Sequence, residues 1–245
     1  MYSLLCAKFA SMFGSPYDFA MPAAPKEIKK APFWKRLLSY AWPLVLERRK
    51  GELGHELEVL VYHGRLHLDT REVNYSFGDL HTVMKTGLDR LKLAPSDMES
   101  VLILGYGGGS VAQLLHQRFS GDMAIVGVEK DPVVLELCHK WFYPYGVKLV
   151  QSDAGEYLAK AVEQQWKYTL IVSDVFIDAD GPGWSAAEWL QLARILAPGG
   201  RILFNSMMDG KALNQQAQWA LEAGLESQTL PVGERNSLLL LRQKN

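Results

Sequence analysis

The chain has 245 residues, which is enough for one large domain or for a domain with an appendage, and either would bury a sizeable core. Its 26 lysines and arginines nearly balance its 27 aspartates and glutamates, so the formal net charge is −1. Such a balance gives no overall field to attract nucleic acid or an anionic membrane, and we expect neither as a partner. Cys6 and Cys138 have no metal-ligand spacing and are expected to be free thiols in a reducing, cytoplasmic compartment.

Residues 1–50 are expected to form an N-terminal extension. Its first twenty residues make a poor signal peptide because charged residues, glycine and proline interrupt them, and no apolar run approaches the ~18 residues needed to span a bilayer. A Pro/Lys-rich linker then leads into an amphipathic segment, whose apolar face carries Trp34, Leu37, Leu38 and Trp42. The segment could be a helix on a membrane surface or a short helix docked on the body or on a second subunit. Pro43 and Glu47 interrupt the pattern and favour docking.

A small β-hairpin domain is predicted for residues 51–73. Apolar and polar residues alternate through "ELEVLVYHGRLHLD", from Glu56 to Asp69, on both sides of a His-Gly turn. His63 and His67 fall on one side of a strand, but no third ligand is nearby, so no metal site is expected. The hairpin would leave an edge strand exposed, and pairing across a two-fold axis would cover it. We therefore expect a homodimer.

Residues 74–245 are predicted to form a Rossmann-like α/β domain. After a helical pattern in "NYSFGDLHTVMKTGLDRL", strands and helices alternate, which indicates a parallel sheet with helices on both faces. The expected strands are 100–105, 124–129, 147–151, 169–174 and 201–206, and the expected helices are 109–119, 132–142, 154–164 and 185–197. The last two strands, "LESQTLPV" and "NSLLLLRQ", are expected to pair as an antiparallel hairpin at a sheet edge.

A glycine-rich loop follows the first strand of this domain, in "VLILGYGGGSVAQLL". Glycines at 105, 107, 108 and 109 would let the backbone approach a ligand, while the amides that open the next helix face an anionic or polar group. Nucleotide-type cofactors fit this pattern, and so does a tight turn with no ligand. Ser110 stands where the strict dinucleotide pattern has glycine or alanine.

Two carboxylates select among the cofactors. Glu129 ends the second strand, where an acid accepts hydrogen bonds from ribose hydroxyls, and this suits NAD and adenosyl-sulfonium cofactors equally. Asp153 ends the third strand, where an acid can accept from an adenine amino group. That position favours an adenosylmethionine-type site.

Residues from about 52 to 206 resemble the polyamine aminopropyltransferase (spermidine synthase) family, a branch of the class I methyltransferase fold. The matching features are an N-terminal hairpin followed by a helix with His81, and the motifs "LGYGGGSV", "VGVEKDP", "SDAGEYL" and "YTLIVSDVFIDADGP". The resemblance implies a mainly parallel seven-stranded sheet ending in an antiparallel hairpin. It also implies S-adenosylmethionine or its decarboxylated form as co-substrate, with no metal. The cofactor-binding residues would be Gly105, Gly107, Gly109, Glu129, Lys130, Asp153 and Ala154.

Asp174 is the candidate catalytic residue. Alkyl transfer from a sulfonium needs in-line positioning and a group that handles the proton of the attacking amine, and a carboxylate at the end of the fourth strand suits that task. The same acid could instead cap the next turn. His81, Asp178 and Trp184 are the candidate substrate-binding residues, although Asp178 could be a solvated loop acid and Trp184 a docked side chain.

Three departures from the family bear on the substrate. Gly108 stands where aminopropyltransferases carry the aspartate that grips the donor's amine, Leu80-His81 replaces a Tyr-His pair, and Ile177 replaces a second acid. These departures fall in the amine-binding half of the site and argue against polyamine synthesis as such. From the resemblance we expect a transferase that moves an aminopropyl or other alkyl group to a small amine. A methyltransferase and a non-catalytic adenosyl-binding or oligomerisation protein remain alternatives, and an NAD-linked oxidoreductase is a further candidate.

Overall fold

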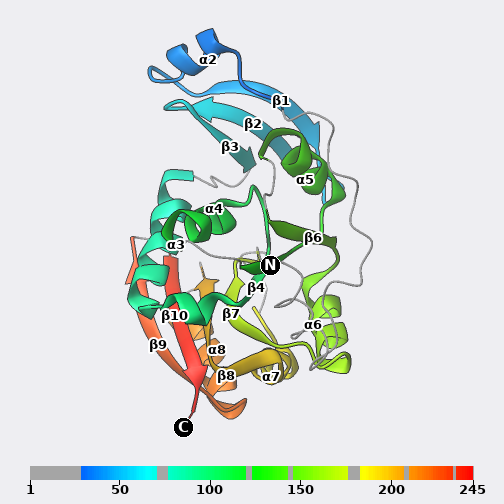
Figure 1. Ribbon diagram of the computed structural model, residues 1–245, viewed down its shortest axis with the longest axis vertical. Helices are drawn as coiled ribbons and strands as arrows, with labels where there is room; N and C mark the ends of the chain where they lie inside the picture. Colours follow the sequence, from blue (N-terminus) through cyan, green and yellow to red (C-terminus); the bar gives the residue numbers. More distant parts are fainter. Residues whose placement is uncertain are drawn as a thin grey trace.

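The computed structural model describes residues 29–70, 77–119, 123–142, 146–175, 183–206, 210–233 and 236–244. It contains a small three-stranded sheet at one end of the molecule and a larger seven-stranded sheet covered by helices (Figure 1). The larger sheet has the strand order β6-β5-β4-β7-β8-β10-β9.

The small sheet is antiparallel, with the order β1-β2-β3. Its elements are α2 (Phe33–Leu38), which precedes it, β1 (Leu44–Lys50), β2 (Glu56–Tyr62) and β3 (Arg65–Thr70). The predicted hairpin is present, and His63 and Gly64 both have positive φ, as a tight two-residue turn requires.

β1 was not expected, since it lies inside the segment assigned to the N-terminal extension. None of its residues is buried, so it lacks the apolar alternation that marks a strand in a sequence. The small sheet therefore begins at Leu44, ahead of the expected boundary at residue 51. β1 also covers the edge of β2 within the same chain. The homodimer stays a prediction, but a second subunit is not needed to cover the β2 edge.

The large sheet consists of five parallel strands and a closing antiparallel pair. The strands are β4 (Ser100–Leu104), β5 (Ala124–Glu129), β6 (Val147–Gln151), β7 (Tyr168–Ser173), β8 (Leu196–Ser206), β9 (Leu225–Val232) and β10 (Asn236–Gln243). The predicted strands are all present, and β8 extends back to Leu196, where it pairs with Tyr168.

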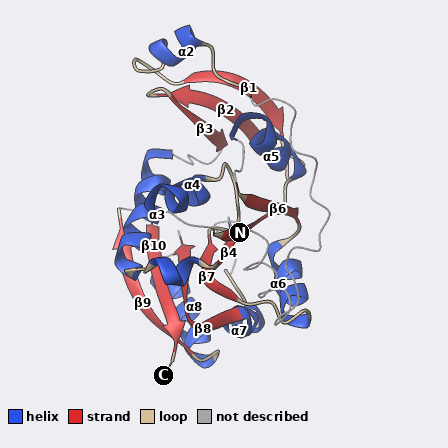
Figure 2. Ribbon diagram, in the orientation of Figure 1, coloured by secondary structure: helices blue, strands red, loops and turns tan. Residues whose placement is uncertain are grey.

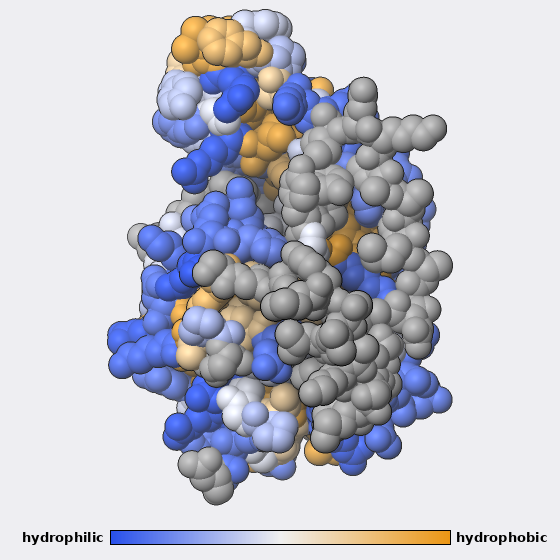
Figure 3. Space-filling view, viewed as in Figure 1, coloured by the Kyte–Doolittle hydropathy of each residue, from blue (hydrophilic) through white to orange (hydrophobic). Residues whose placement is uncertain are grey.

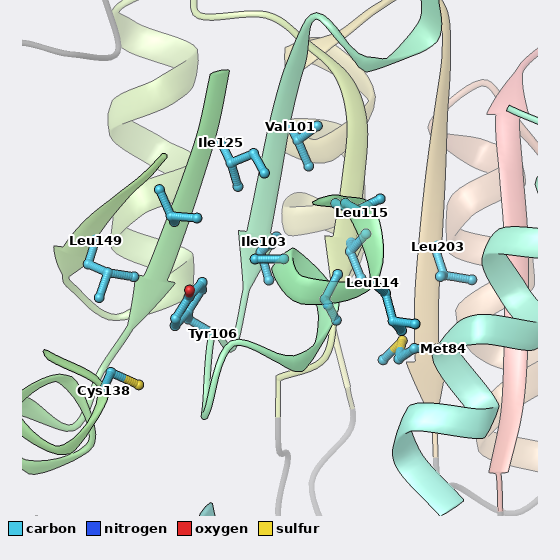
Figure 4. Packing of buried hydrophobic residues seen from close by; sticks show 14 of the residues in the cluster. Met84, Val101, Ile103, Tyr106, Leu114, Leu115, Ile125, Cys138, Leu149 and Leu203 are labelled. Carbon is cyan, nitrogen blue, oxygen red and sulfur yellow. The ribbon is translucent and has the colours of Figure 1, made fainter. Parts of the chain in front are cut away.

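Helices pack on both faces of this sheet (Figure 2). They are α3 (Phe77–Leu91), α4 (Ser110–Arg118), α5 (Pro132–Leu137) with its π-helical continuation η2 (Cys138–Phe142), α6 (Ala154–Glu163), α7 (Ala186–Ile195) and α8 (Gly210–Glu222), with a 3-10 turn, η1 (Pro95–Met98), before β4. Residues of α3, α4 and α5 share one buried cluster with side chains of the central strands, as Figure 4 shows for Leu115, Ile103 and Met84. Residues of α6, α7 and α8 form the cluster on the other face.

α8 was not predicted, and its buried face explains why. Leu213, Gln216 and Ala220 are its buried residues, so a glutamine occupies a core position. The Gln216 Oε1 accepts from the Trp189 indole at 2.9 Å and from the Trp184 N–H at 3.1 Å. A glutamine that satisfies two tryptophan donors breaks the apolar pattern on which a sequence-based helix prediction depends.

α2 has no buried residue and presents a large apolar surface at the end of the molecule (Figure 3). The exposed side chains on it and just after it are Phe33, Trp34, Leu37, Leu38, Tyr40 and Trp42. The expected short helix therefore exists, but it is not docked on the body by that face. Among the described residues, no helix is long and apolar enough to cross a membrane.

Polar contacts tie the small sheet to the large domain. Glu47 of β1 accepts from Lys140 Nζ at 2.6 Å and from Trp141 Nε1 at 2.7 Å, both on η2. Burial alone would raise the pKa of Glu47, but these two bonds hold it below its ordinary value. Arg49 pairs with Glu136 of α5 at 3.0 Å. These contacts fix β1 against the helix that follows β5.

We expect Glu47→Gln to lower the free energy of unfolding by about 1–3 kcal/mol, because the charge-assisted bond to Lys140 is lost in a half-buried place. Urea unfolding measures this loss. Glu226→Gln is the matched control: it removes an exposed pair with Arg242 and should change stability by less than about 1 kcal/mol. Equal effects of the two substitutions would contradict a structural role for Glu47.

Candidate functional site

The loop from Gly105 to Gly109 joins β4 to α4 and is fixed from several sides. Gly105, Gly107 and Gly109 all have positive φ, which glycine adopts without strain. The N–H groups of Gly105 and Tyr106 both donate to the Val128 carbonyl at 3.0 Å. A side chain at position 105 would meet the Asp174 carbonyl oxygen at 2.4 Å from its Cβ, so the loop and the end of β7 approach each other closely.

Glu129, at the end of β5, binds this loop directly. Its Oε2 accepts from the Gly107 N–H at 3.0 Å, and its Oε1 accepts from the N–H groups of Lys130 and Asp131 at 2.9 and 3.1 Å. Burial raises the pKa of Glu129, and the three N–H donors oppose that rise by favouring the ionised form. The carboxylate therefore lies between the glycine loop and the start of α5.

Asp153 caps the N-terminus of α6. Its Oδ1 accepts from the Gly155 and Glu156 N–H groups, and its Oδ2 pairs with Lys130 Nζ at 3.1 Å. Burial would raise the pKa of Asp153, but Lys130 and the capping N–H groups lower it. Ala154 is the first residue of α6, where the helix itself provides no acceptor for the backbone N–H. The Asp153 carboxylate, an acceptor, and the Ala154 N–H, a donor, thus lie side by side at the end of β6.

Asp174 follows β7 and lies partly buried beside the glycine loop. Its N–H donates to the Leu104 carbonyl at 2.8 Å, and its Oδ1 accepts from Asn205 Nδ2 at 2.9 Å. Burial raises the pKa of Asp174 to about 7, the bond from Asn205 partly offsets this, and the charge of Glu129 adds to it. This carboxyl group can gain or lose a proton near neutral pH.

The strand order places these groups along one edge of the sheet. β6, β5, β4 and β7 are neighbours and parallel, so Asp153, Glu129, the glycine loop and Asp174 follow one another at their carboxyl ends. Such an edge is where open α/β sheets bind their ligands. Within the described residues, no group of three or more metal-ligating side chains gathers.

His81 lies on the other side of the glycine loop. It lines a cavity of about 630 Å³ together with Gly108 and Gly109 of the loop and Arg65 of β3. Burial lowers the pKa of His81, and the positive charges of Arg65 and Lys85 lower it further. Glu129, Asp153 and Asp174 do not line this cavity, so the structure groups His81 with a different set of side chains from the three acids.

The other two candidate substrate-binding residues lie elsewhere. Trp184 is buried in the core cluster on the α7 face, and its indole N–H donates to Ser173 Oγ at 2.9 Å. The sequence left open whether Trp184 binds substrate or is a docked side chain, and in the structure it is docked. Asp178 and Ile177 lie outside the described residues.

Three functional neighbours were missed from the sequence. Tyr106 is buried beneath the loop, where the absence of a side chain at Gly127 leaves room for its ring (Figure 4). Cys138 Sγ donates to the Gly107 carbonyl at 2.8 Å, and burial raises its pKa, so the thiol stays protonated. Asn205 reaches Asp174 from β8. Gly127 and Gly109, which lie against the Tyr106 ring, were a usable signal in the sequence. Nothing in the sequence placed Cys138 or Asn205 at the loop.

We expect Asp174→Asn to raise the melting temperature at pH 8 by roughly 5–10 °C. In the unfolded chain Asp174 ionises near its ordinary pKa of 3.8, whereas in the folded chain it does so near 7, so folding stability falls as pH rises between these values and stays low above them. The upper bound is about 4 kcal/mol, at about 2–4 °C per kcal/mol. Thermal unfolding at pH 5 and pH 8 measures the difference, which should shrink at pH 5.

The control is Asp153→Asn, because the pKa of Asp153 is lowered and the sign reverses. This variant should be no more stable than the unsubstituted protein at pH 8. A lower melting temperature for Asp174→Asn at pH 8 would contradict the buried, high-pKa carboxyl.

No protein-family model matches this chain. Two curated proteins match parts of it: the eEF1A lysine and N-terminal methyltransferase of Xenopus laevis, 42% identical over 65 residues, and the polyamine aminopropyltransferase of Vibrio vulnificus, 33% identical over 81 residues. These segments are 25% and 32% of this chain, and they span only 9% and 27% of the relatives' own lengths.

Solved structures match over more of the chain. Human methyltransferase-like protein 13, in complex with SAH, is 25% identical, with a TM-score of 0.57 over 68% of this chain and 82% of that one. Spermidine synthase from Thermotoga maritima is 13% identical, with a TM-score of 0.59 over 82% of this chain and 73% of that one. The two curated relatives are transferases by name, and the two solved structures are a methyltransferase-like protein and a spermidine synthase. The resemblance to the aminopropyltransferases is confirmed, and the chain has the Rossmann-like class I methyltransferase fold.

Proposed function

We propose that this protein transfers a methyl group from S-adenosylmethionine to a nitrogen atom of a small molecule. One observation carries the proposal: three acids of different electrostatic character lie in sequence along the carboxyl edge of β6, β5 and β7, around a glycine loop with room for a ligand. Human methyltransferase-like protein 13, which shares the fold, binds SAH, the nucleoside that remains after methyl transfer.

The nucleoside would be held by Glu129 and Asp153. Glu129 would accept hydrogen bonds from the two ribose hydroxyls. Asp153 would accept from the adenine amino group while the Ala154 N–H donates to the ring beside it. Gly107 has no atom near the place where its Cβ would lie, so a ligand can approach the backbone there. The lowered pKa of Asp153 keeps it an acceptor at neutral pH.

Asp174 would act on the acceptor. In the transfer the nitrogen lone pair forms the new N–C bond, the C–S bond breaks with its electrons going to sulfur, and the proton on nitrogen passes to the ionised Asp174. A base with a pKa near 7 combines adequate ionisation with adequate basicity at neutral pH. Asn205 acts through Asp174 as a positioning residue, because its amide holds one carboxylate oxygen in place.

Gly108 favours methyl transfer over aminopropyl transfer. An aspartate here would attract the ammonium of a decarboxylated donor and repel the carboxylate of S-adenosylmethionine, and glycine does neither. Arg65 lines the same cavity as Gly108 and adds a positive charge. The methionine carboxylate would meet no like charge from these residues.

Aminopropyl transfer is the second candidate, because a spermidine synthase structure matches a larger share of this chain than human methyltransferase-like protein 13 does. That match covers 82% of this chain, against 68% for human methyltransferase-like protein 13. A non-catalytic adenosyl-binding protein is the alternative outside enzymes, and turnover tests it.

The first test compares donors by calorimetry. We expect S-adenosylmethionine to bind more tightly than its decarboxylated form, and Gly108→Asp to reverse the order by weakening S-adenosylmethionine about 10-fold or more. A Cβ at position 108 would come within 3.2 Å of the Leu68 Cβ, so the control must carry the same bulk. Gly108→Asn provides it. Decarboxylated donor binding more tightly to the unsubstituted protein would favour aminopropyl transfer, and no binding of either donor would end the proposal.

The second test follows turnover against pH with a panel of small amines, including amino acids and phosphorylated amines. S-adenosylhomocysteine as product indicates methyl transfer, and methylthioadenosine indicates aminopropyl transfer. We expect kcat/KM to rise with an apparent pKa near 7 as Asp174 ionises, and Asp174→Asn to lower kcat by about 10²–10⁴ and to abolish that rise. An unchanged rate in Asp174→Asn would remove Asp174 from the chemistry. Donor binding with no turnover across the panel would favour the non-catalytic alternative.

A further inference from the structure

The cavity beside the glycine loop has walls from both parts of the molecule. One wall is the start of β3 with the segment that leads into α2. The other is made by α4, by the start of α3 and by η2. The volume of about 630 Å³ is large enough for a small organic molecule.

Its charge is one-sided. Among the described residues that line it, the four with a formal charge are all cations: Lys29, Lys30, Arg36 and Arg65. The whole chain holds 26 such cations and 27 acids, so this composition is not that of the average surface. His81 and His116 also line it, and neither side chain adds a negative charge.

Three of the four lining cations have no ion-pair partner among the described residues. Lys30, Arg36 and Arg65 form no ion pair in the part of the chain that the structure describes. All three are exposed at the rim. Like charges around one cavity repel one another, and an anion bound between them relieves that repulsion.

The floor is apolar and aromatic. Trp141 and Phe142 of η2 line it, with Tyr106 and Cys138 beneath the glycine loop. Lys29 Nζ lies 5.8 Å from the centroid of the Trp141 ring, so a cation and a flat surface already stand together. A ligand that fits both features has a flat apolar body and an anionic group.

We propose that this cavity binds a small organic anion, a carboxylate or phosphate attached to a flat apolar body. The cavity shares Gly108 and Gly109 with the glycine loop but is not lined by Asp174, so this anion would bind beside the donor site and the inference does not depend on the proposed methyl transfer. A polyamine carries the opposite charge to this ligand. Its ammonium groups would face four cations and no carboxylate among the described lining residues.

The test uses 1-naphthyl phosphate as the probe, titrated into the full chain by calorimetry without donor. We expect 1-naphthyl phosphate to bind at least about 10-fold more tightly than neutral 1-naphthol and than inorganic phosphate, and spermidine not to compete. Lys30→Gln/Arg36→Gln should weaken 1-naphthyl phosphate binding about 25-fold, at about five-fold for each exposed charge removed. Raising the salt concentration should weaken binding more in the unsubstituted protein than in this variant.

The matched control is Arg194→Gln/Lys211→Gln, which removes two exposed cations that do not line the cavity. It should leave 1-naphthyl phosphate affinity unchanged. Equal loss in both double variants, binding of 1-naphthol or inorganic phosphate as tight as that of 1-naphthyl phosphate, or displacement by spermidine would overturn the proposal. Absence of 1-naphthyl phosphate binding to a protein that still binds S-adenosylmethionine would overturn the anion site and leave the methyl-transfer proposal standing. Binding of 1-naphthyl phosphate to a protein that does not bind S-adenosylmethionine would leave the anion site standing and overturn the methyl-transfer proposal.

Discussion

The geometry of the glycine loop depends on its contacts with the strand beside it. Glu129 receives the Gly107 N–H, and the Val128 carbonyl receives two more donors from the loop. A partly buried carboxyl group that accepts from backbone N–H groups holds them at a set distance, since moving them would leave its oxygens without donors. On the other side, the Asp174 carbonyl lies against Gly105, where only a glycine fits. The loop, Glu129 and the backbone of Asp174 therefore pack together as one rigid structure.

The electrostatics divide the molecule into two zones that meet at this loop. On the sheet edge, acids dominate, and burial makes one of them a weak acid while hydrogen bonds and Lys130 keep another ionised. On the other side, cations of the small sheet and of the segment before it surround an aromatic floor. A sulfonium donor is cationic and suits the first zone. The second zone suits an anionic partner.

Glu47 and Arg49 hold the two walls of the cavity together, so the small sheet contributes to the cavity as well as to the fold.

The sequence predicted the large sheet and the acids at its edge because both depend on local signals. Parallel strands buried on both faces are continuous apolar runs, and an acid placed after such a run must lie at the carboxyl edge. The parts that were missed depend on contacts between distant segments. β1 has no buried face of its own, and α8 devotes a core position to Gln216, which serves two tryptophans. Trp184 looked available for a ligand, and only the tertiary structure reveals Ser173 as its partner.

The ring of Tyr106 fills the space beneath the loop, against Gly127 and Gly109. Burial raises its pKa, and it stays a neutral wedge at any ordinary pH. A loop supported in this way is already ordered when the crevice is empty, so the entropy of immobilising it is lost during folding and not at the moment of association. A guest molecule would then meet a rigid receptor, and its affinity would not be reduced by the cost of organising the backbone around it.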